Sequence, residues 1–166
     1  YNFRHALMHE LRAQGYEVLL VSPPGKFVSR LQAEGFRWLP WKLKPHSVAP
    51  WGEILSFWHI AQIYRRERPD IVHNHTIKSV LYGSLASALV SVPTVVNTIS
   101  GRGYVFLGQG WQPRLIRRLI APFYRFALRN ISSAVIFENQ ADRHFFQEAG
   151  FVLPERAYLI EGVGTD

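Results

Sequence analysis

Polar side chains gather at three places along the chain, each at the end of a short apolar run. The first segment runs from His73 to Lys78, the second from Asn97 to Gly103, and the third from Glu138 to Gln140. Imidazole, hydroxyl, amide and carboxylate groups can bind polar ligands, and some of them can transfer protons. What these groups do together depends on whether the fold brings the three segments to one place.

The first segment contains the pair His73 and His75, whose spacing suggests metal ligands. We expect the two side chains to point to opposite faces of a strand, so that they cannot easily share one ion. No carboxylate follows them before Glu138, and the chain has no cysteine. We therefore predict no metal site. Two alternatives stay open: ligand contact by His75, Thr76 or Lys78, or packing of His73 in the sheet with His75 capping the next helix.

The second segment contains a short glycine-rich sequence, Ser100-Gly101-Arg102-Gly103. Its backbone N–H groups and its guanidinium could bind a phosphate. It lacks the third glycine of a dinucleotide-binding turn and the Gly-Lys-Ser/Thr of a P-loop. The aromatic residues Tyr104 and Phe106 suggest that the loop covers something. The alternative is a mobile surface loop.

The third segment supplies Glu138 and Asn139. A single carboxylate at the end of a strand could orient a ligand hydroxyl or act as a base, and it could equally cap the helix expected to begin near Asp142. No catalytic triad is visible, so we assign no catalytic residue.

The positive charge of the chain lies in one block. The net charge is +7, from 19 Lys and Arg against 12 Asp and Glu. Between Asp70 and Glu138 there are seven cations and no carboxylate, while the rest of the chain is balanced. Such segregation favours contact with phosphates on lipid, nucleotide or nucleic acid. The alternative is a basic protein that its charge keeps soluble.

Five of these cations fall on one predicted helix, from about Gln112 to Asn130. At 100° per residue they occupy an arc of roughly 120°: Arg114, Arg117, Arg118, Arg125 and Arg129. Apolar residues, including Phe123 and Phe126, fill the opposite arc, and Pro122 is expected to kink or split the helix. We expect the basic face to dock on anionic lipid. Because the aromatic residues lie opposite the arginines, nucleic acid is a poorer fit; a merely solvated face is the alternative.

The elements that must position these groups alternate between strand and helix about six times. The strands are short apolar runs, a pattern typical of a parallel sheet covered on both faces. The fold class is therefore α/β, a doubly wound, mostly parallel, Rossmann-like sheet. No signal peptide and no apolar run long enough to span a membrane are visible. The expected strands are 16–21, 36–39, 70–73, 94–98, 134–137 and 157–160, and the expected helices are 3–15, 27–33, 51–69, 77–90, 112–130 and 142–149.

Three stretches together resemble the amino-terminal half of GT-B glycosyltransferases, especially glycosyltransferase family 4. They are Asn2-Phe3-Arg4-His5 with Gln14-Gly15-Tyr16-Glu17-Val18, the stretch from Arg68 to Lys78, and Pro93-Thr94-Val95-Val96-Asn97-Thr98-Ile99-Ser100-Gly101. The tail from Ile160 to Asp166 is similar to the family's crossing into its second domain. The pattern looks most like the bacterial branch that builds capsule, O-antigen (lipopolysaccharide) and exopolysaccharide repeats.

The resemblance implies a domain spanning residues 1–161, with 162–166 beginning an inter-domain linker. It also implies that a first strand and a carboxyl-terminal, donor-binding domain lie outside this sequence. Because that strand would lie in the middle of the sheet, we expect the sheet to be interrupted there. Many family members carry a His at the end of the strand that ends near Ser100, and this sequence has none there.

The implied function is that of the acceptor-side domain of a retaining, metal-independent glycosyltransferase. It would help move a sugar from a nucleotide-sugar to a lipid-linked or polysaccharide acceptor, on the cytoplasmic face of the plasma membrane. No cofactor is expected, and the nucleotide-sugar would bind mainly to the other domain. The implied acceptor-side residues are His75, Thr76, Lys78, Ser100, Gly101, Arg102, Gly103, Glu138 and Asn139. The alternatives are half of a GT-B nucleotide-sugar epimerase, or a noncatalytic basic module that binds anionic membrane or nucleic acid.

Overall fold

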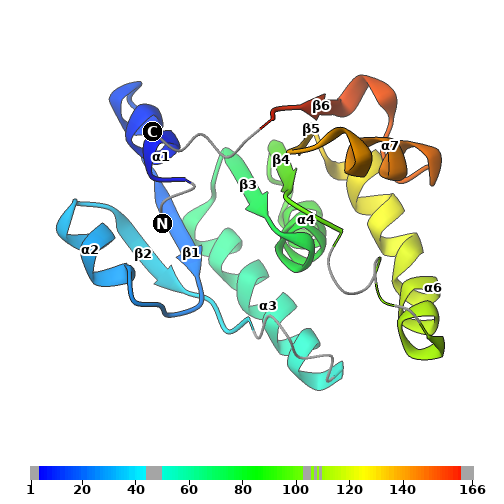
Figure 1. Cartoon of the computed structure of the whole chain (residues 1–166). Helices are drawn as coiled ribbons and strands as arrows, with labels where there is room; N and C mark the ends of the chain where they lie inside the picture. The colour runs from blue at the N-terminus through cyan, green and yellow to red at the C-terminus, as the bar shows by residue number, and fades with distance from the viewer. Residues whose placement is uncertain (1–3, 44–49, 103–105, 107, 109, 162–166) are drawn as a thin grey trace. The chain divides into compact units, whose positions relative to one another are not determined.

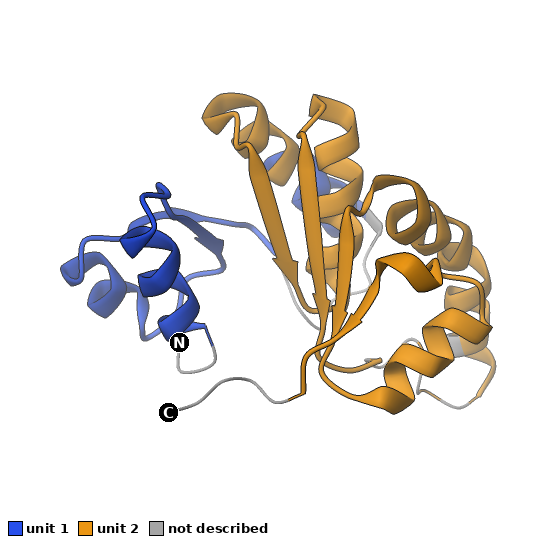
Figure 2. Cartoon of the chain, turned by 90° about the horizontal axis from the view of Figure 1, so that it is seen from above, with its two compact units in different colours: residues 1–59, 162–166 blue, residues 60–161 orange. Residues whose placement is uncertain are grey.

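The computed structural model describes residues 4–43, 50–102, 106, 108 and 110–161. It divides into two compact units (Figure 2). Unit 1 comprises residues 1–59 and 162–166, and unit 2 comprises residues 60–161. The linker expected at 162–166 lies outside the described residues. Among the helices described, none combines the length and apolar character needed to cross a membrane.

Unit 1 pairs two short strands in parallel and packs helices beside them (Figure 1). The strands are β1, Leu19–Ser22, and β2, Arg37–Pro40; the helices are α1, His5–Ala13, α2, Val28–Ala33, and the first part of α3, Pro50–Glu67. Both α1 and α2 end at a glycine with positive φ, Gly15 at 90° and Gly35 at 86°. The left-handed conformation that glycine permits reverses the chain into the following strand.

The apolar side chains buried in unit 1 include Met8, Phe36 and Trp41. The Trp41 indole donates a hydrogen bond to the carbonyl oxygen of Ser56 at 2.9 Å. The Ser56 hydroxyl in turn donates to the carbonyl of Lys42 at 2.6 Å. These bonds attach the chain after β2 to α3. They also give hydrogen-bond partners to polar groups that would destabilise the fold if they were buried without one.

Unit 2 contains a four-stranded parallel sheet in the order β3-β4-β5-β6 (Figure 2). Its strands are β3, Ile71–His75, β4, Thr94–Ile99, β5, Ala134–Phe137, and β6, Ala157–Leu159. The expected parallel α/β class is thus confirmed. The described strands form two sheets, one in each unit.

The helices of unit 2 bury one face of this sheet. Along β3, Val72 and Asn74 are buried, while His73 and His75 are only partly buried. The core on this face contains Val135 and Phe137 of β5. Three helices pack against it: α4, Ile77–Val90, α6, Trp111–Phe126, and α7, Gln140–Glu148. The other face of the sheet presents half-buried residues, among them the two histidines.

A buried polar network joins β3, β4 and α4. The Asn74 amide donates to Asn97 Oδ1 at 3.0 Å, and these two residues are partners in the strand register. Asn97 donates through its own amide to the hydroxyls of Ser84 at 2.9 Å and Ser132 at 2.6 Å. The Tyr64 hydroxyl donates to Asn74 Oδ1 at 3.2 Å. Burial raises the pKa of Tyr64, so it remains a donor.

The predicted arginine helix is α6, which Pro122 does not split. A short π-helix, η1, Ala127–Ile131, follows α6 directly and carries the chain to Ser132. The buried Tyr124 hydroxyl donates to the carbonyl oxygen of Ile77 at 2.8 Å. That bond holds α6 against the first turn of α4.

Gly83 is required because α4 lies directly over Asn74. A Cβ at Gly83 would stand 1.9 Å from Asn74 Oδ1, an atom held in the buried network. We expect Gly83→Ala to lower the free energy of unfolding by about 2–4 kcal/mol, because it causes overpacking and breaks a buried hydrogen bond. Urea unfolding followed by circular dichroism measures the loss.

The matched control is Gly52→Ala, also within a helix, where a Cβ would meet no atom within 4 Å. Its stability should be unchanged or slightly raised, because alanine favours the helix. If the two substitutions change the free energy of unfolding equally, the Asn74 side chain moves aside easily and the network is not rigid.

Candidate functional site

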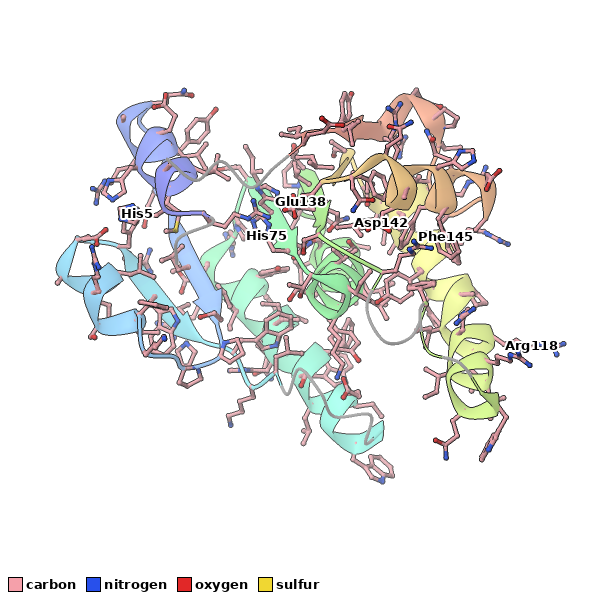
Figure 3. All side chains as sticks on the ribbon, viewed as in Figure 1. His5, His75, Arg118, Glu138, Asp142 and Phe145 are labelled. Atoms are coloured by element: carbon pink, nitrogen blue, oxygen red, sulfur yellow. The ribbon has the colours of Figure 1, made fainter. Side chains whose placement is uncertain are left out.

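The three polar segments meet at one edge of the unit 2 sheet. All four strands are parallel, so their carboxyl ends lie on the same edge. His75 is in register with Thr98, and Ile99 with Phe137, the residue before Glu138. Figure 3 shows His75 and Glu138 at this edge. The sequence therefore identified three segments that do share one place.

The histidine pair shares one face of β3, so our expectation of opposite faces was wrong. Side chains two residues apart on a strand point the same way, and the rings of His73 and His75 lie 4.1 Å apart between centroids. His73 Nε2 forms a hydrogen bond with Thr98 Oγ1 at 2.7 Å. His73 is thus tied into the sheet, as one alternative proposed, while His75 lies nearer the edge.

Thr76 has an unusual backbone conformation, with φ 72° and ψ 153° at the start of α4. Such a conformation is nearly exclusive to glycine and costs about 1–3 kcal/mol for other residues. Strain of this kind is concentrated at functional sites. The turn places the exposed Thr76, and Lys78 in the first turn of α4, directly after the carboxyl end of β3.

Arg102 extends from the loop after β4 to helix α7. Its Nε lies 2.8 Å from Asp142 Oδ1, and its guanidinium carbon stands 5.1 Å from the centroid of the Phe145 ring. Asp142 is buried and Arg102 is about one-third exposed. Figure 3 shows Asp142 and Phe145 on the same helix. The guanidinium is therefore held in a fixed direction rather than loose on a mobile loop.

Asn139, rather than Glu138, caps α7. Its Oδ1 accepts a hydrogen bond from the backbone N–H of Asp142 at 2.8 Å, and its Nδ2 donates to Asp142 Oδ2 at 2.9 Å. Asn139 is thus a structural residue of the site. Glu138 is half-buried, just beyond the end of β5.

The remaining loop residues divide into three groups. Gly101 has φ 156° and open space where a Cβ would stand, next to the exposed Ser100. Gly103 and Tyr104 lie outside the described residues. Phe106 is 5% exposed and packs edge-on against Tyr124 and Phe151 in the core. Phe106 therefore anchors the loop instead of covering a ligand.

The arrangement suits an anionic or hydroxyl-rich ligand. The amino terminus of α4 directs backbone N–H groups and a partial positive charge to the carboxyl edge of the sheet. Lys78 adds a positive charge, the charge of Arg102 is paired with the Asp142 carboxylate, and Glu138 adds a further carboxylate. These groups can bind a phosphate and orient hydroxyls.

The basic face of α6 is only partly free. Arg117, Arg125 and Arg129 donate hydrogen bonds to the backbone carbonyl oxygens of Gly108, Ala149 and Gly150, respectively. Arg114 and Arg118 are exposed, and Figure 3 shows Arg118 pointing away from the fold. Three of the five predicted membrane-facing arginines thus also have structural contacts.

The apolar arc of α6 is partly exposed, although we expected it to pack opposite the arginines. A set of large apolar residues, here called the α6 stripe, is 50–72% exposed: Trp111, Leu115, Leu119, Phe123 and Phe126. At 100° per residue the stripe lies directly beside Arg118 on the helix surface. Clustered exposed apolar residues mark interaction sites.

The fold is that of known glycosyltransferases. A glycosyltransferase from Rickettsia africae matches with a TM-score of 0.65 at 16% identity, over 96% of this chain and 38% of that one. MurG from Acinetobacter baumannii matches with a TM-score of 0.61 at 14% identity, over 97% and 41%. Both similarities are similarities of fold. They confirm the expected GT-B class of architecture.

The sequence comparison identifies the family. Residues 2–139 match the model described as "Glycosyl transferase 4-like", and the chain belongs to that family. Along its whole length it is 22% identical to the N,N'-diacetylbacillosaminyl-diphospho-undecaprenol alpha-1,3-N-acetylgalactosaminyltransferase of Campylobacter jejuni. The chain spans 44% of that relative's length.

Sequence reasoning missed Asp142 as the partner of Arg102. The two residues are far apart in the sequence, and Asp142 had been placed only as a helix start. A usable signal existed, since Asn139 and Asp142 have the three-residue spacing of a helix cap. That cap fixes where the carboxylate points.

Replacing Thr76 with glycine tests whether the backbone conformation at this position is strained. We expect Thr76→Gly to raise the free energy of unfolding by about 1–2 kcal/mol, because glycine adopts this conformation without penalty, less the entropy glycine adds to the unfolded chain. Urea unfolding measures the change.

Ser91→Gly is the comparison variant, at the other end of α4, where φ is 60° and ψ 46°. That left-handed conformation is less unusual, so its gain should be smaller. A loss of stability in Thr76→Gly would mean that contacts of the threonine side chain outweigh the backbone strain.

Proposed function

We propose that this chain is the acceptor-side half of a glycosyltransferase that moves a sugar from a nucleotide-sugar to a lipid-linked acceptor. The observation that carries the proposal is the family match combined with the polar, cationic edge of the unit 2 sheet. The relative from Campylobacter jejuni is named for a diphospho-undecaprenol substrate. Its name supports a transferase rather than an epimerase.

The acceptor would place its diphosphate near the amino terminus of α4. Lys78 and Arg102 supply charge there, while Ser100 and Glu138 can hydrogen-bond sugar hydroxyls. Gly101 would let the ligand approach the backbone closely. His75, Thr76 and Asn139 shape the same edge.

The donor nucleotide-sugar would bind mainly to a second domain, in a reaction that retains the anomeric configuration. The charged edge described above would stabilise charge that develops as the sugar leaves the donor phosphate. No metal or cofactor takes part in this scheme. The residues proposed to contact the acceptor therefore position it and do not form covalent bonds.

The α6 stripe and its arginines would dock the protein on the cytoplasmic face of an anionic membrane. Exposed Trp, Leu and Phe side chains can enter the interface between headgroups and acyl chains, and arginines attract anionic lipid. Placing the protein at that surface brings it to a lipid-linked acceptor. Capsule or lipopolysaccharide synthesis fits this role.

Lys78 gives a direct test of acceptor binding. We expect the 166-residue chain to bind a short-chain polyprenyl diphosphate sugar in detergent micelles, and Lys78→Gln to weaken that binding about tenfold, because one charge-assisted contact is lost. Fluorescence titration measures the dissociation constants. Without a donor half, we expect no sugar transfer by this chain alone.

Lys26→Gln, which removes an exposed lysine of unit 1, is the control and should bind as the parent does. Equal affinities for all three proteins would move the acceptor site away from α4. Sugar turnover by the chain alone would contradict the division into donor and acceptor halves.

Membrane docking should depend on the two exposed arginines. We expect Arg114→Gln with Arg118→Gln to weaken binding to phosphatidylglycerol-containing vesicles by about 2 kcal/mol, roughly 30-fold, since each cation contributes about 1 kcal/mol. Stability should hardly change, because glutamine has similar helix propensity and both side chains are exposed. Co-sedimentation at two salt concentrations measures this binding.

The charge-matched control is Arg65→Gln with Arg66→Gln, which removes two exposed arginines from α3. If the two double variants bind the vesicles equally weakly, binding depends on the net charge of the chain and not on the α6 face. Unchanged binding by the α6 double would assign its arginines to solubility alone.

A further inference from the structure

Two helices of unit 1 bring two histidines and a glutamate to one point. His5 Nε2 lies 2.6 Å from Glu34 Oε2, and His9 Nε2 lies 3.1 Å from the same oxygen. The two histidine nitrogens are themselves 3.1 Å apart. In the part of the chain that the structure describes, this is the one group of three such residues whose ligand atoms converge.

Local structure explains the convergence. His5 and His9 are four residues apart on α1 and therefore lie on the same helix face. Glu34 is the residue that ends α2, and Gly35 then turns the chain into β2. Figure 3 shows His5 at the foot of α1, on the side of α2. Each side chain is between one-quarter and two-fifths exposed, so an ion can reach them.

Protons alone cannot satisfy this triangle of atoms. A carboxylate has no proton, and each Nε2 carries at most one. Three contacts among three atoms therefore have at most two protons between them. When both imidazoles donate to Glu34 Oε2, their N–H groups approach each other with no acceptor between the two nitrogens. A cation at the centre would instead be attracted to all three atoms.

The donor set and its spacing match zinc. Two imidazole nitrogens and one carboxylate oxygen form one of the common three-ligand zinc sets. Tetrahedral bonds of about 2.0–2.1 Å separate neighbouring ligand atoms by about 3.3 Å. The observed separations, from 2.6 to 3.1 Å, need to widen only slightly.

We propose that His5, His9 and Glu34 form a binding site for Zn²⁺, with water in the fourth position, that fastens α1 to the end of α2. The described residues of unit 1 form a two-stranded sheet and a small core. Small folds often take stability from a metal, because their cores bury little apolar surface. The role of this site is structural.

Zinc must displace the Nε2 proton of each histidine that donates to Glu34, and at His9 this change also involves Arg12. Its Nη2 lies 3.2 Å from His9 Nδ1, so His9 accepts there and carries its proton on Nε2. Zinc takes the place of that proton, which moves through solvent to Nδ1, and the Arg12 contact opens. The guanidinium keeps its bond to the carbonyl of Glu34 at 2.7 Å and its place over the Phe36 ring.

Calorimetric titration of the EDTA-dialysed 166-residue chain with Zn²⁺ tests the site. We expect one tight zinc per chain and a rise in the thermal midpoint with zinc concentration. His5→Gln and His9→Gln should each weaken binding at least tenfold, since even partners of ligands contribute that much. Co²⁺ bound in place of zinc should give the visible absorption of a four-coordinate site.

The matched control is His144→Gln with Glu148→Gln, which removes an exposed His–Glu pair of α7 whose atoms lie 3.1 Å apart. This control should keep the zinc. No uptake by the parent chain would overturn the proposal and leave an ion pair between His5 and Glu34. Undiminished binding by both histidine variants would overturn it as well. Circular dichroism in EDTA verifies that each variant folds.

Discussion

The carboxamide of Asn97 holds unit 2 together. It sits fully buried in the central part of the sheet and bonds to Asn74 of the next strand, Ser84 of α4 and Ser132 after η1. A buried polar group without partners destabilises a fold by about 1–3 kcal/mol. Every element that supplies a partner is therefore constrained to one position, including the strand register between β3 and β4.

That constraint explains how the edge can carry strain. Directly after β3 the chain adopts the unfavourable conformation at Thr76, and α4 starts there. The close approach of Gly83 to Asn74 fixes the same helix further along. Rigid packing below the edge thus holds Thr76 and the start of α4 in place.

The sequence was sufficient to predict the features that depend on local sequence pattern. All six described strands lie within a few residues of the predicted ones, and the strand from Ala134 to Phe137 matches at both ends. The sequence could predict that the three polar segments meet, because the carboxyl ends of parallel strands lie together. Asn74 and Asn97 belong to the predicted polar segments, yet their side chains are buried in the core. The sequence could not show this, because their partners are revealed only by the packing of α4 and η1.

Other features depend on distant contacts. Nothing in the spacing of the arginines along α6 and η1 indicates that Arg125 and Arg129 bond to Ala149 and Gly150. Periodicity places Leu119 and Phe123 on the apolar arc of the helix, but it cannot show that no neighbouring element in the described part of the chain covers them there. The His5–His9 spacing was visible in the sequence, but its third member comes from another helix.

One hydrogen bond has a wider consequence. The hydroxyl of Tyr124 connects α6 to the carbonyl of Ile77, between Thr76 and Lys78. Burial raises the pKa of Tyr124 well above its ordinary value, so this bond persists at every physiological pH. A surface that stabilises one orientation of α6 would thereby favour one orientation of the first turn of α4. Linked equilibria are reciprocal, so a ligand held at that turn would strengthen the binding of α6 to its surface by the same free energy.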